Sequence, residues 1–424
     1  MLLYHRGDIK DDLNSRDLKD ALFGALDKLG PKKKVLVVPP DFTRYHSRAG
    51  ELTCCAWEYY GDNLTDILPA LGTHAPMTES EIARMFGRTP PTLFREHRWR
   101  SDLVTVGEVP SDFIRQVSED RVDYSWPAQL NRMVVEGRFD LILSIGQVVP
   151  HEVSGMANYN KNIFIGTGGS DGINRSHFLG AAYGMERIMG RADNPVRRIL
   201  NYASDHFAEN LPIVYVLTIV APDQDGAIKT RGLFIGDDIQ CFNLAAALSL
   251  KVNFTMLDRP LKKVVVYLDP AEYKSTWLGN KSIYRTRMAI ADGGELIVLA
   301  PGVMEFGEDT QIDRLIRKYG YVGTERVLDA VKKNDDLRKN LSAAAHLIHG
   351  SSEGRFRITY CPGKIGKEQI EAVNFSFAPL PDMLKKYDPE KLRDGFNILD
   401  DGEEIYFISK PSMGLWSFRD RFKN

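Results

Sequence analysis

The sequence predicts an α/β protein of two lobes, in which each lobe is a mostly parallel sheet with flanking helices. Apolar runs of strand length alternate with segments of helical periodicity over most of the chain, which is typical of strands joined by helical crossovers. Some runs, such as residues 35–40, are apolar without interruption, as expected for parallel strands covered on both faces. The chain has 424 residues, which exceeds one ordinary hydrophobic core and favours two domains.

The first domain is predicted to span residues 1–257. Helical spacing covers residues 16–29 before Gly30-Pro31, and a buried strand at residues 34–40 is ended by prolines. The same pattern recurs at residues 62–72. The remaining predicted elements are a helix starting at the capping box Thr78–Glu81, helix and irregular surface over 90–137, a strand over 139–145, helices over 196–209 and 243–251, a strand over 212–220, and a surface hairpin over 226–236.

The second domain is predicted to span residues 258–408, because Asp258-Arg259-Pro260 interrupts the pattern and a fresh alternation of strands and helices follows. The polar tail, residues 409–424, is a candidate to pack back on the first domain. The predicted elements are strands over 263–268, 295–301, 356–360 and 404–408, and a mostly helical stretch over 308–348.

Composition limits the classes of partner. The 55 Lys and Arg against 57 Asp and Glu give a net charge of −2, so nothing argues for nucleic acid or an anionic membrane. No apolar run approaches the roughly 20 residues that span a bilayer, and the amino terminus turns polar too early for a signal peptide. The four cysteines contain no CxxC pair, which favours reduced thiols, and we expect a cytoplasmic protein.

Polar residues follow two of the predicted strands. Asp41-Phe42-Thr43-Arg44 comes directly after the strand at 34–40, and these residue types suit the hydroxyls, phosphate or carboxylate of a small ligand. An Asx turn with a surface arginine is the alternative. His74 lies in the loop before the helix that starts near Thr78, where the helix dipole favours a neutral imidazole and hence a general base. Its alternative is a loop histidine without a task.

The stretch from Gly146 to Gly180 follows another strand end and holds His151, Lys161 and His177 within 27 residues. It offers a metal ligand, a proton shuttle and a nucleophilic amine. Glycines 166, 168 and 169 either let backbone N–H groups approach an anionic cofactor or form a plain turn.

Taken in order, Asp41-x-Thr43-Arg44, Gly72-Thr73-His74-x-Pro76-Met77-Thr78, and His151, Lys161 and His177 at their spacing resemble the nickel-dependent lactate racemases and their relatives. The resemblance continues through Lys281 and Gly293-Gly294 and covers most of the chain. Each short motif is common, whereas the ordered set is fairly specific.

This resemblance implies a nickel-pincer nucleotide attached to Lys161, with His177 completing the coordination of nickel. It places Asp41 and Thr43 at the nucleotide portion of the cofactor. Gly168 and Gly169, whose backbone N–H groups can approach an anionic cofactor, are also assigned to cofactor binding. Separate cofactor-building proteins are then required as partners.

The resemblance further implies that His74 and His151 are the two acid/base residues. Arg44 and Lys281 resemble the cations that hold the substrate carboxylate, and Trp277 stands where the family has a polar or aromatic residue before that lysine. Because Arg44 and Lys281 belong to different domains, the active site is predicted in the inter-lobe cleft.

The implied reaction is inversion of C2 of a 2-hydroxy acid by removal and return of hydride. Substrates of opposite hand present their hydroxyl on opposite sides, so two bases with a pKa near neutrality are required. The segment Asn158-Tyr159-Asn160 departs from the family pattern and adds hydrogen-bonding groups. We therefore predict a polyhydroxylated substrate of the gluconate/mannonate type rather than lactate.

Three other functions remain open. A nicotinamide-dependent sugar-acid oxidoreductase lacks a G-x-G-x-x-G fingerprint after an early strand. A zinc hydrolase would use His346-x-x-His349, but no HExxH accompanies this pair. A non-catalytic hydroxy-acid binding protein on the same scaffold would bind the acid without inverting it.

Overall fold

The computed structural model describes residues 1–223 and 226–422. The chain forms two compact units, of which the first comprises Met1–Ser176 and Ile188–Asn253 and the second comprises His177–Arg187 and Phe254–Asn424. Each unit is an α/β assembly around a six-stranded sheet, so the predicted fold class is confirmed. No helix of the described residues is both long and apolar enough to cross a membrane.

The sheet of the first unit is parallel at its centre and antiparallel at one side. Its order is β1 (Leu2–Gly7), β10 (Ile228–Gly236), β9 (Ile213–Pro222), β6 (Leu141–Gln147), β2 (Val35–Val38) and β3 (Leu64–Ile67). β9, β6, β2 and β3 are mutually parallel, whereas β10 is antiparallel to both β1 and β9. The predicted surface hairpin at 226–236 is wrong, because β10 has a ladder partner on each side and is largely buried.

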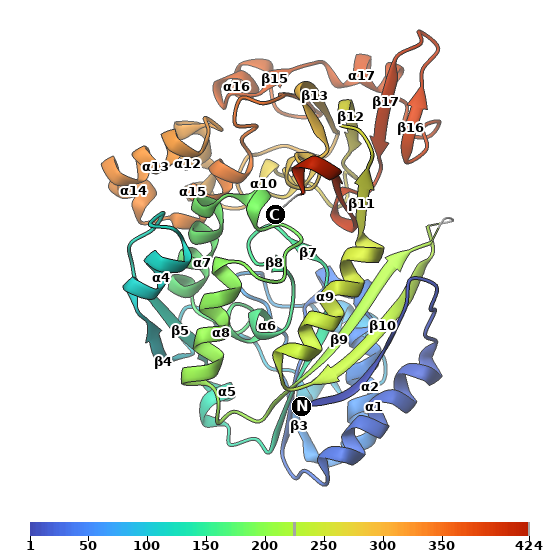
Figure 1. Ribbon diagram of the computed structural model, residues 1–424, viewed down its shortest axis with the longest axis vertical. Helices are drawn as coiled ribbons and strands as arrows, with labels where there is room; N and C mark the ends of the chain where they lie inside the picture. The colour runs from blue at the N-terminus through green and yellow to red at the C-terminus, as the bar shows by residue number, and fades with distance from the viewer. Residues whose placement is uncertain (224–225, 423–424) are drawn as a thin grey trace. The chain divides into compact units, whose positions relative to one another are not determined.

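Helices cover both faces of this sheet (Figure 1). α1 (Ser15–Leu29) and α2 (Ala49–Tyr60) pack their apolar sides on one face, and α9 (Ile239–Asn253) lies across β9 and β10 on the other. α1 begins where predicted, because Asn14 and Asp17 form a capping box. α3 (Glu79–Phe86) is likewise capped by the predicted pair Thr78 and Glu81.

Residues 90–137, predicted as helix and irregular surface, do contain helices, but they also contain an antiparallel ribbon that the prediction missed. The ribbon pairs β4 (Leu103–Val109) with β5 (Trp126–Asn131). The alternation Trp126-x-Ala128-x-Leu130, all buried, is the period-2 signal that identifies β5. Helices beside the ribbon are α4 (Ser111–Val117), α5 (Arg132–Glu136) and α8 (Pro195–Phe207).

Short elements connect these parts of the first unit. They are η1 (Phe42–Ser47), η2 (Gly61–Asn63), η3 (Pro91–Leu93), β7 (Pro150–His151), β8 (Gly155–Met156) and α6 (Asn160–Phe164). The longer α7 (Ser170–Tyr183) contributes residues to both units, and η4 (Met185–Arg187) belongs to the second.

The sheet of the second unit is parallel except at one edge. Its order is β15 (Ser376–Phe377), β14 (Arg357–Pro362), β13 (Ile290–Ala300), β12 (Leu261–Tyr267), β17 (Glu404–Ile408) and β16 (Gly395–Ile398), with β16 antiparallel. The four predicted strands of this domain correspond to β12, β13, β14 and β17. In the tail, β18 (Leu415–Phe418) pairs in parallel with β11 (Phe254–Leu257), and both strands cluster with the second unit.

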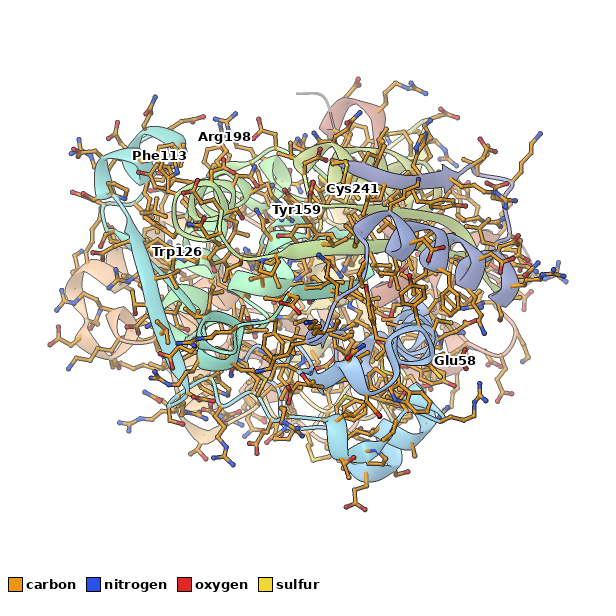
Figure 2. The ribbon with its side chains drawn as sticks, turned by 90° about the horizontal axis from the view of Figure 1, so that it is seen from below. Glu58, Phe113, Trp126, Tyr159, Arg198 and Cys241 are labelled. Carbon is orange, nitrogen blue, oxygen red and sulfur yellow. The ribbon has the colours of Figure 1, made fainter. Side chains whose placement is uncertain are left out.

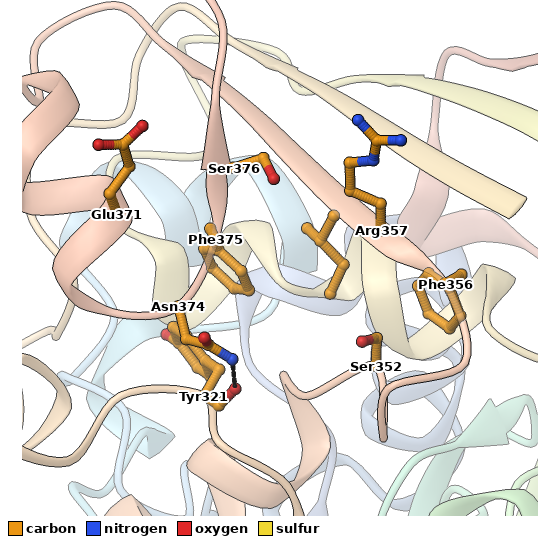
Figure 3. A pocket seen from close by; sticks show the side chains of 9 residues that line it. Tyr321, Ser352, Phe356, Arg357, Glu371, Asn374, Phe375 and Ser376 are labelled. Atoms are coloured by element: carbon orange, nitrogen blue, oxygen red, sulfur yellow. Dashed lines mark hydrogen bonds between the residues drawn. The ribbon is translucent and has the colours of Figure 1, made fainter. Parts of the chain in front are cut away.

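Eight helices are described in the second unit beyond residue 257: α10 (Thr276–Gly279), α11 (Lys281–Thr286), α12 (Thr310–Tyr319), α13 (Thr324–Lys333), α14 (Asp335–Arg338), α15 (Leu341–His349), α16 (Lys367–Ala372) and α17 (Leu380–Lys386). A polar hollow of about 220 Å³ lies beside β14 and β15, with Arg357 and Glu371 among its lining residues (Figure 3). None of the predicted site residues lines it.

Candidate active site

Asp41 and His74 meet beyond the carboxyl ends of two neighbouring parallel strands. Asp41 follows β2 and caps η1, where its carboxylate accepts hydrogen bonds from the backbone N–H of Thr43 at 3.1 Å and from the Thr43 hydroxyl. Its second oxygen lies 2.5 Å from Nδ1 of His74. The Asx turn that was the alternative for this segment is present, and it also orients the carboxylate toward a histidine.

Burial shapes the charge of this pair. Burial alone raises the pKa of the Asp41 carboxyl, but the hydrogen bond and charge of His74, with the two bonds from Thr43, lower it, and the net shift is downward. Asp41 is therefore a carboxylate at neutral pH. Its side chain is 8% exposed, whereas that of His74 is 60% exposed, so the buried acid holds an accessible ring.

The hydrogen bond to the Asp41 carboxylate determines which ring nitrogen of His74 carries the proton. Because Asp41 only accepts, Nδ1 of His74 carries the proton, and the neutral ring presents the lone pair of Nε2. His74 is then a base at Nε2. The sequence argument relied on the dipole of the following helix, but α3 starts only at Glu79, and the direct contact of the ring is with Asp41.

His151 is held in the opposite tautomer. Its Nδ1 accepts the backbone N–H of Val153 at 3.1 Å and that of Ser154 at 3.5 Å. A nitrogen that accepts from N–H groups carries no proton, so the neutral ring carries its proton on Nε2. His151 is therefore prepared to donate a proton at Nε2, whereas His74 is prepared to accept one.

Lys161 lies in the first turn of α6, which is tied to the sheet by its neighbour. The amide of Asn162 donates to the carbonyl of Val38 at 3.0 Å and to the hydroxyl of Ser144 at 3.0 Å, on β2 and β6 respectively. Lys161 is thereby placed near the carboxyl ends of parallel strands, the location expected for ligand sites in open α/β sheets.

The amine of Lys161 is poorly solvated. Burial, followed by the positive charges of Arg44 and Arg197, lowers its pKa to about 8, while Glu152 and Asp41 oppose the shift. About half of such amines are neutral at pH 8, which makes Lys161 a competent nucleophile. These mutual effects also show that Asp41, Arg44 and Glu152 share the surroundings of the amine.

The glycines after Lys161 are required by packing. A Cβ atom at Gly168 would lie 1.9 Å from the carbonyl oxygen of Phe164, and one at Gly169 would lie 2.3 Å from the Gln129 side chain. The carbonyl of Gly168 also accepts from Nε2 of His97 at 3.0 Å. Contacts within the protein thus explain these glycines, and their role in cofactor binding stays a prediction.

The three residues that motivated a sugar-acid substrate are engaged inside the protein. Asn158, Tyr159 and Asn160 are 7%, 6% and 0% exposed. The amide of Asn160 donates to Asn201 at 2.8 Å and Ser204 at 3.2 Å, and the Tyr159 ring stacks on Phe242. These side chains are therefore unsuited to recognising substrate hydroxyls.

Three predicted residues belong to the second unit. His177 is a half-buried residue of α7, Lys281 opens α11, and Trp277 lies in α10 with its ring stacked on His346 at 4.5 Å. Their functional roles stay predictions.

His346 itself is structural. Hydroxyls of Tyr284 and Tyr321 lie 2.7 and 2.8 Å from its two ring nitrogens, and burial lowers its pKa to about 3. Among the residues that the structure describes, no group of three or more His, Cys, Asp or Glu side chains could hold a metal ion.

Comparison with known proteins identifies the first part of the chain. Residues 24–187 match the family model of the lactate racemase N-terminal domain. This segment is similar to that domain family. It includes all of the predicted site residues except Trp277 and Lys281, so both acid/base histidines and the candidate cofactor lysine lie in the matched segment.

Two solved structures share the fold over nearly the whole chain. A crystal structure of a Thermotoga maritima protein is 26% identical, with a TM-score of 0.79, covering 96% of this chain and 99% of its own. The lactate racemase apoprotein from Thermoanaerobacterium thermosaccharolyticum is 16% identical, with a TM-score of 0.72, covering 96% of this chain and 93% of its own. No curated protein matches the sequence.

The residues present fit a lysine-linked metal cofactor. The desolvated amine of Lys161, in the segment that matches the lactate racemase N-terminal domain, offers an attachment point, and its lowered pKa favours acylation. Since the described residues contain no cluster able to hold a metal alone, one histidine ligand such as His177 requires further donors from the cofactor itself.

Sequence reasoning missed two residues near Lys161. Glu152 directly follows His151 in the chain, and an acidic residue beside a candidate base is a signal that could have identified it. Arg197 approaches from α8, which is remote in sequence, so no local pattern points to it.

Proposed function

We propose that the chain is a racemase or epimerase that inverts C2 of a 2-hydroxy acid, using a nickel-pincer nucleotide attached to Lys161 and ligated by His177. When bound, this cofactor accepts and returns the C2 hydride. The observation that carries the proposal is the opposite hydrogen bonding of His74 and His151 in a domain that also holds the desolvated Lys161.

The chain's own residues supply proton transfer and orientation. His74 Nε2 takes the proton of the substrate hydroxyl as the C2 hydrogen leaves, and Asp41 stabilises the imidazolium that forms. On the return, the planar 2-keto acid receives hydrogen on the other face of C2 and a proton on oxygen from Nε2 of a protonated His151. Solvent then removes the proton held by His74 and reprotonates His151, which restores the starting charges. Starting from the enantiomer, His151 takes the hydroxyl proton and His74 supplies one, so each ring begins in the other protonation state.

Arg44 and Lys281 are proposed to hold the substrate carboxylate, with Trp277 beside it. A fixed carboxylate keeps C2 in one place, so that substrates of opposite hand direct their hydroxyl groups toward different histidines. Arginine suits this task because its planar guanidinium binds a carboxylate in a bidentate manner.

The substrate is proposed as a 2-hydroxy acid, with lactate and the gluconate/mannonate type as the two candidates. The sequence argument for a sugar acid rested on Asn158-Tyr159-Asn160, and the burial of these residues removes that support. Turnover of a substrate panel that contains lactate, gluconate and mannonate decides between the two classes.

The proposal is tested with protein produced alongside cofactor-building enzymes, which are its expected partners. We expect a mass increment on Lys161, about one nickel per chain, and inversion of a C2-deuterated substrate with deuterium retained at C2. Exchange of this deuterium with solvent would instead indicate that C2 loses a proton rather than a hydride. Binding without inversion would identify a hydroxy-acid binding protein, and net oxidation with added NAD would identify an oxidoreductase.

Single substitutions separate the proposed roles. His74→Gln and His151→Gln should each abolish inversion with nickel retained, whereas His177→Ala should lower the nickel content. Loss of nickel in His74→Gln, or full nickel in His177→Ala, contradicts these assignments.

A further inference from the structure

The segment that leads into Lys161 has an unfavourable backbone. Asn158 and Tyr159 have φ values of +62° and +60°, a region that residues other than glycine rarely occupy. Such a conformation persists only where the surrounding structure holds it, and it is concentrated at functional sites. The Tyr159 ring, which lies in the interior near Cys241 of α9 in Figure 2, packs between Tyr215 and Phe242.

One face of α8 holds this segment. Arg197, Asn201 and Ser204 are spaced i, i+4 and i+7 and therefore share that face. Arg197 donates to the carbonyls of Met156 at 2.7 Å and Asn158 at 3.3 Å. All three side chains also bond Asn160: Arg197 donates to its oxygen at 2.5 Å, and its amide donates to Asn201 and Ser204.

Arg197 carries a charge that packing alone does not require. The residue is 1% exposed, and no carboxylate of the described residues pairs with it. Its guanidinium lies 4.3 Å from the centre of the Phe242 ring. Burying an arginine without a counter-ion is costly unless its donors are used. Here the two terminal nitrogens bond acceptors of residues 156–160, whereas the buried Nε has no hydrogen-bond partner.

We propose that Arg197, Asn201 and Ser204 are positioning residues, which hold residues 156–160, including the positive-φ residues Asn158 and Tyr159, in place and thereby fix how the amine of Lys161 is presented. The inference rests on the proposed function, since it gives a purpose to the presentation of that amine. The positive charge of Arg197 acts in the same sense, because it helps to lower the pKa of Lys161.

The test measures the amine of Lys161 in protein without cofactor. Trace labelling with acetic anhydride between pH 6 and 11, read by peptide mass spectrometry, gives the pH midpoint of Lys161 acylation. We expect a midpoint near 8 in the natural protein and a higher one in Arg197→Met. Complete return to an ordinary lysine pKa would reduce the neutral fraction at pH 8 from about one half to below about one in a hundred.

Two further variants separate charge from geometry. Arg197→Lys keeps the charge but lacks the planar set of donors, so we expect its midpoint to stay above that of the natural protein. The double variant Asn201→Ala with Ser204→Ala leaves Arg197 in place. In this variant we expect amide hydrogens of residues 156–164 to exchange at least about tenfold faster, together with a raised midpoint.

Arg198→Met is the matched control, because Arg198 is the adjacent residue of α8 and points to the periphery (Figure 2), where it pairs with Asp193. Its midpoint should equal that of the natural protein. If Arg197→Met does not fold, as judged by circular dichroism, the double variant decides. Folded variants with lowered melting temperature but an unchanged Lys161 midpoint and unchanged exchange would overturn the proposal.

The proposed function can fail independently. Acylation needs no cofactor, so a shifted midpoint in the double variant, which keeps the charge of Arg197, supports positioning even if co-produced protein gains no mass at Lys161. A mass increment at Lys161 with an unshifted midpoint in the variants would leave the proposed function intact and refute the positioning role.

Discussion

Asp41→Asn is the most informative single substitution, because it changes a charge and a tautomer with almost no change of volume. In the natural protein the Asp41 carboxylate accepts from His74 Nδ1 at 2.5 Å and from the backbone N–H of Thr43 at 3.1 Å. An asparagine has only one oxygen. If that oxygen accepts from Thr43, the amide N–H₂ faces His74 and makes Nδ1 an acceptor, which moves the imidazole proton to Nε2.

The expected loss of activity follows from the strength of that contact. A hydrogen bond to a charged group contributes about 1.5–3 kcal/mol, or about 10- to 150-fold in rate when it acts on the transition state. The corresponding substitution in a serine-protease triad, which also inverts a histidine tautomer, costs about 10⁴-fold. We therefore expect kcat to fall by at least about 10-fold and at most about 10⁴-fold. Both directions of the reaction should slow together, because the equilibrium constant is unchanged.

The assay combines initial rates in both directions with ¹⁵N NMR of the His74 ring, in protein whose nickel content and Lys161 mass increment are verified. Thr43→Val is the control, since it removes one donor to Asp41 and keeps the carboxylate. We expect it to lose less than about tenfold, the effect of one neutral hydrogen bond. An Asp41→Asn protein with a rate within twofold of the natural one and an inverted tautomer would refute the reasoning.

Three further predictions concern stability. The lowered pKa of Lys161 means that the unfolded state binds more protons than the folded state between pH 8 and 10.5, so the free energy of unfolding rises with pH over that interval. Lys161→Met should remove this pH dependence. In denaturant titrations at pH 7, it should stabilise the protein by at most about 3 kcal/mol. Burial lowers the pKa of His346 to about 3, so below about pH 6.5 the unfolded state binds a proton that the folded state does not, and the free energy of unfolding should fall as the pH decreases toward 3. His346→Gln should make this fall less steep. The nickel content should stay unchanged. Glu186 bonds Arg287 at 3.1 Å and Arg355 at 2.7 Å, and its side chain is 26% exposed. Glu186→Gln should therefore destabilise the second unit by about 1–3 kcal/mol in thermal unfolding. No measurable loss would show that the arginines find other partners.

Much of the fold was predictable because its signals are local. The helix over residues 16–29 and the start of the helix near Thr78 follow from periodicity and from capping boxes, both of which lie within a few residues. The β4–β5 ribbon was missed because its alternation is short and interrupted by polar residues. The burial of β10 was missed because it depends on β1, which lies more than 200 residues away in the chain.

The sequence by itself determined which chemistry-bearing side chains follow which strands, namely Asp41 after β2, His151 after β6 and Lys161 on the helix that returns to them. Tertiary structure alone decided the tautomers of the two histidines, because the partner of His74 lies 33 residues away and the partners of His151 require a particular turn. It also decided that the side chain of Asn160 bonds Arg197, 37 residues away, so that this side chain is not available to bind the substrate. The local sequence pattern determines which residue types follow each strand. Which hydrogen-bond partner a side chain has is determined only when distant segments pack together.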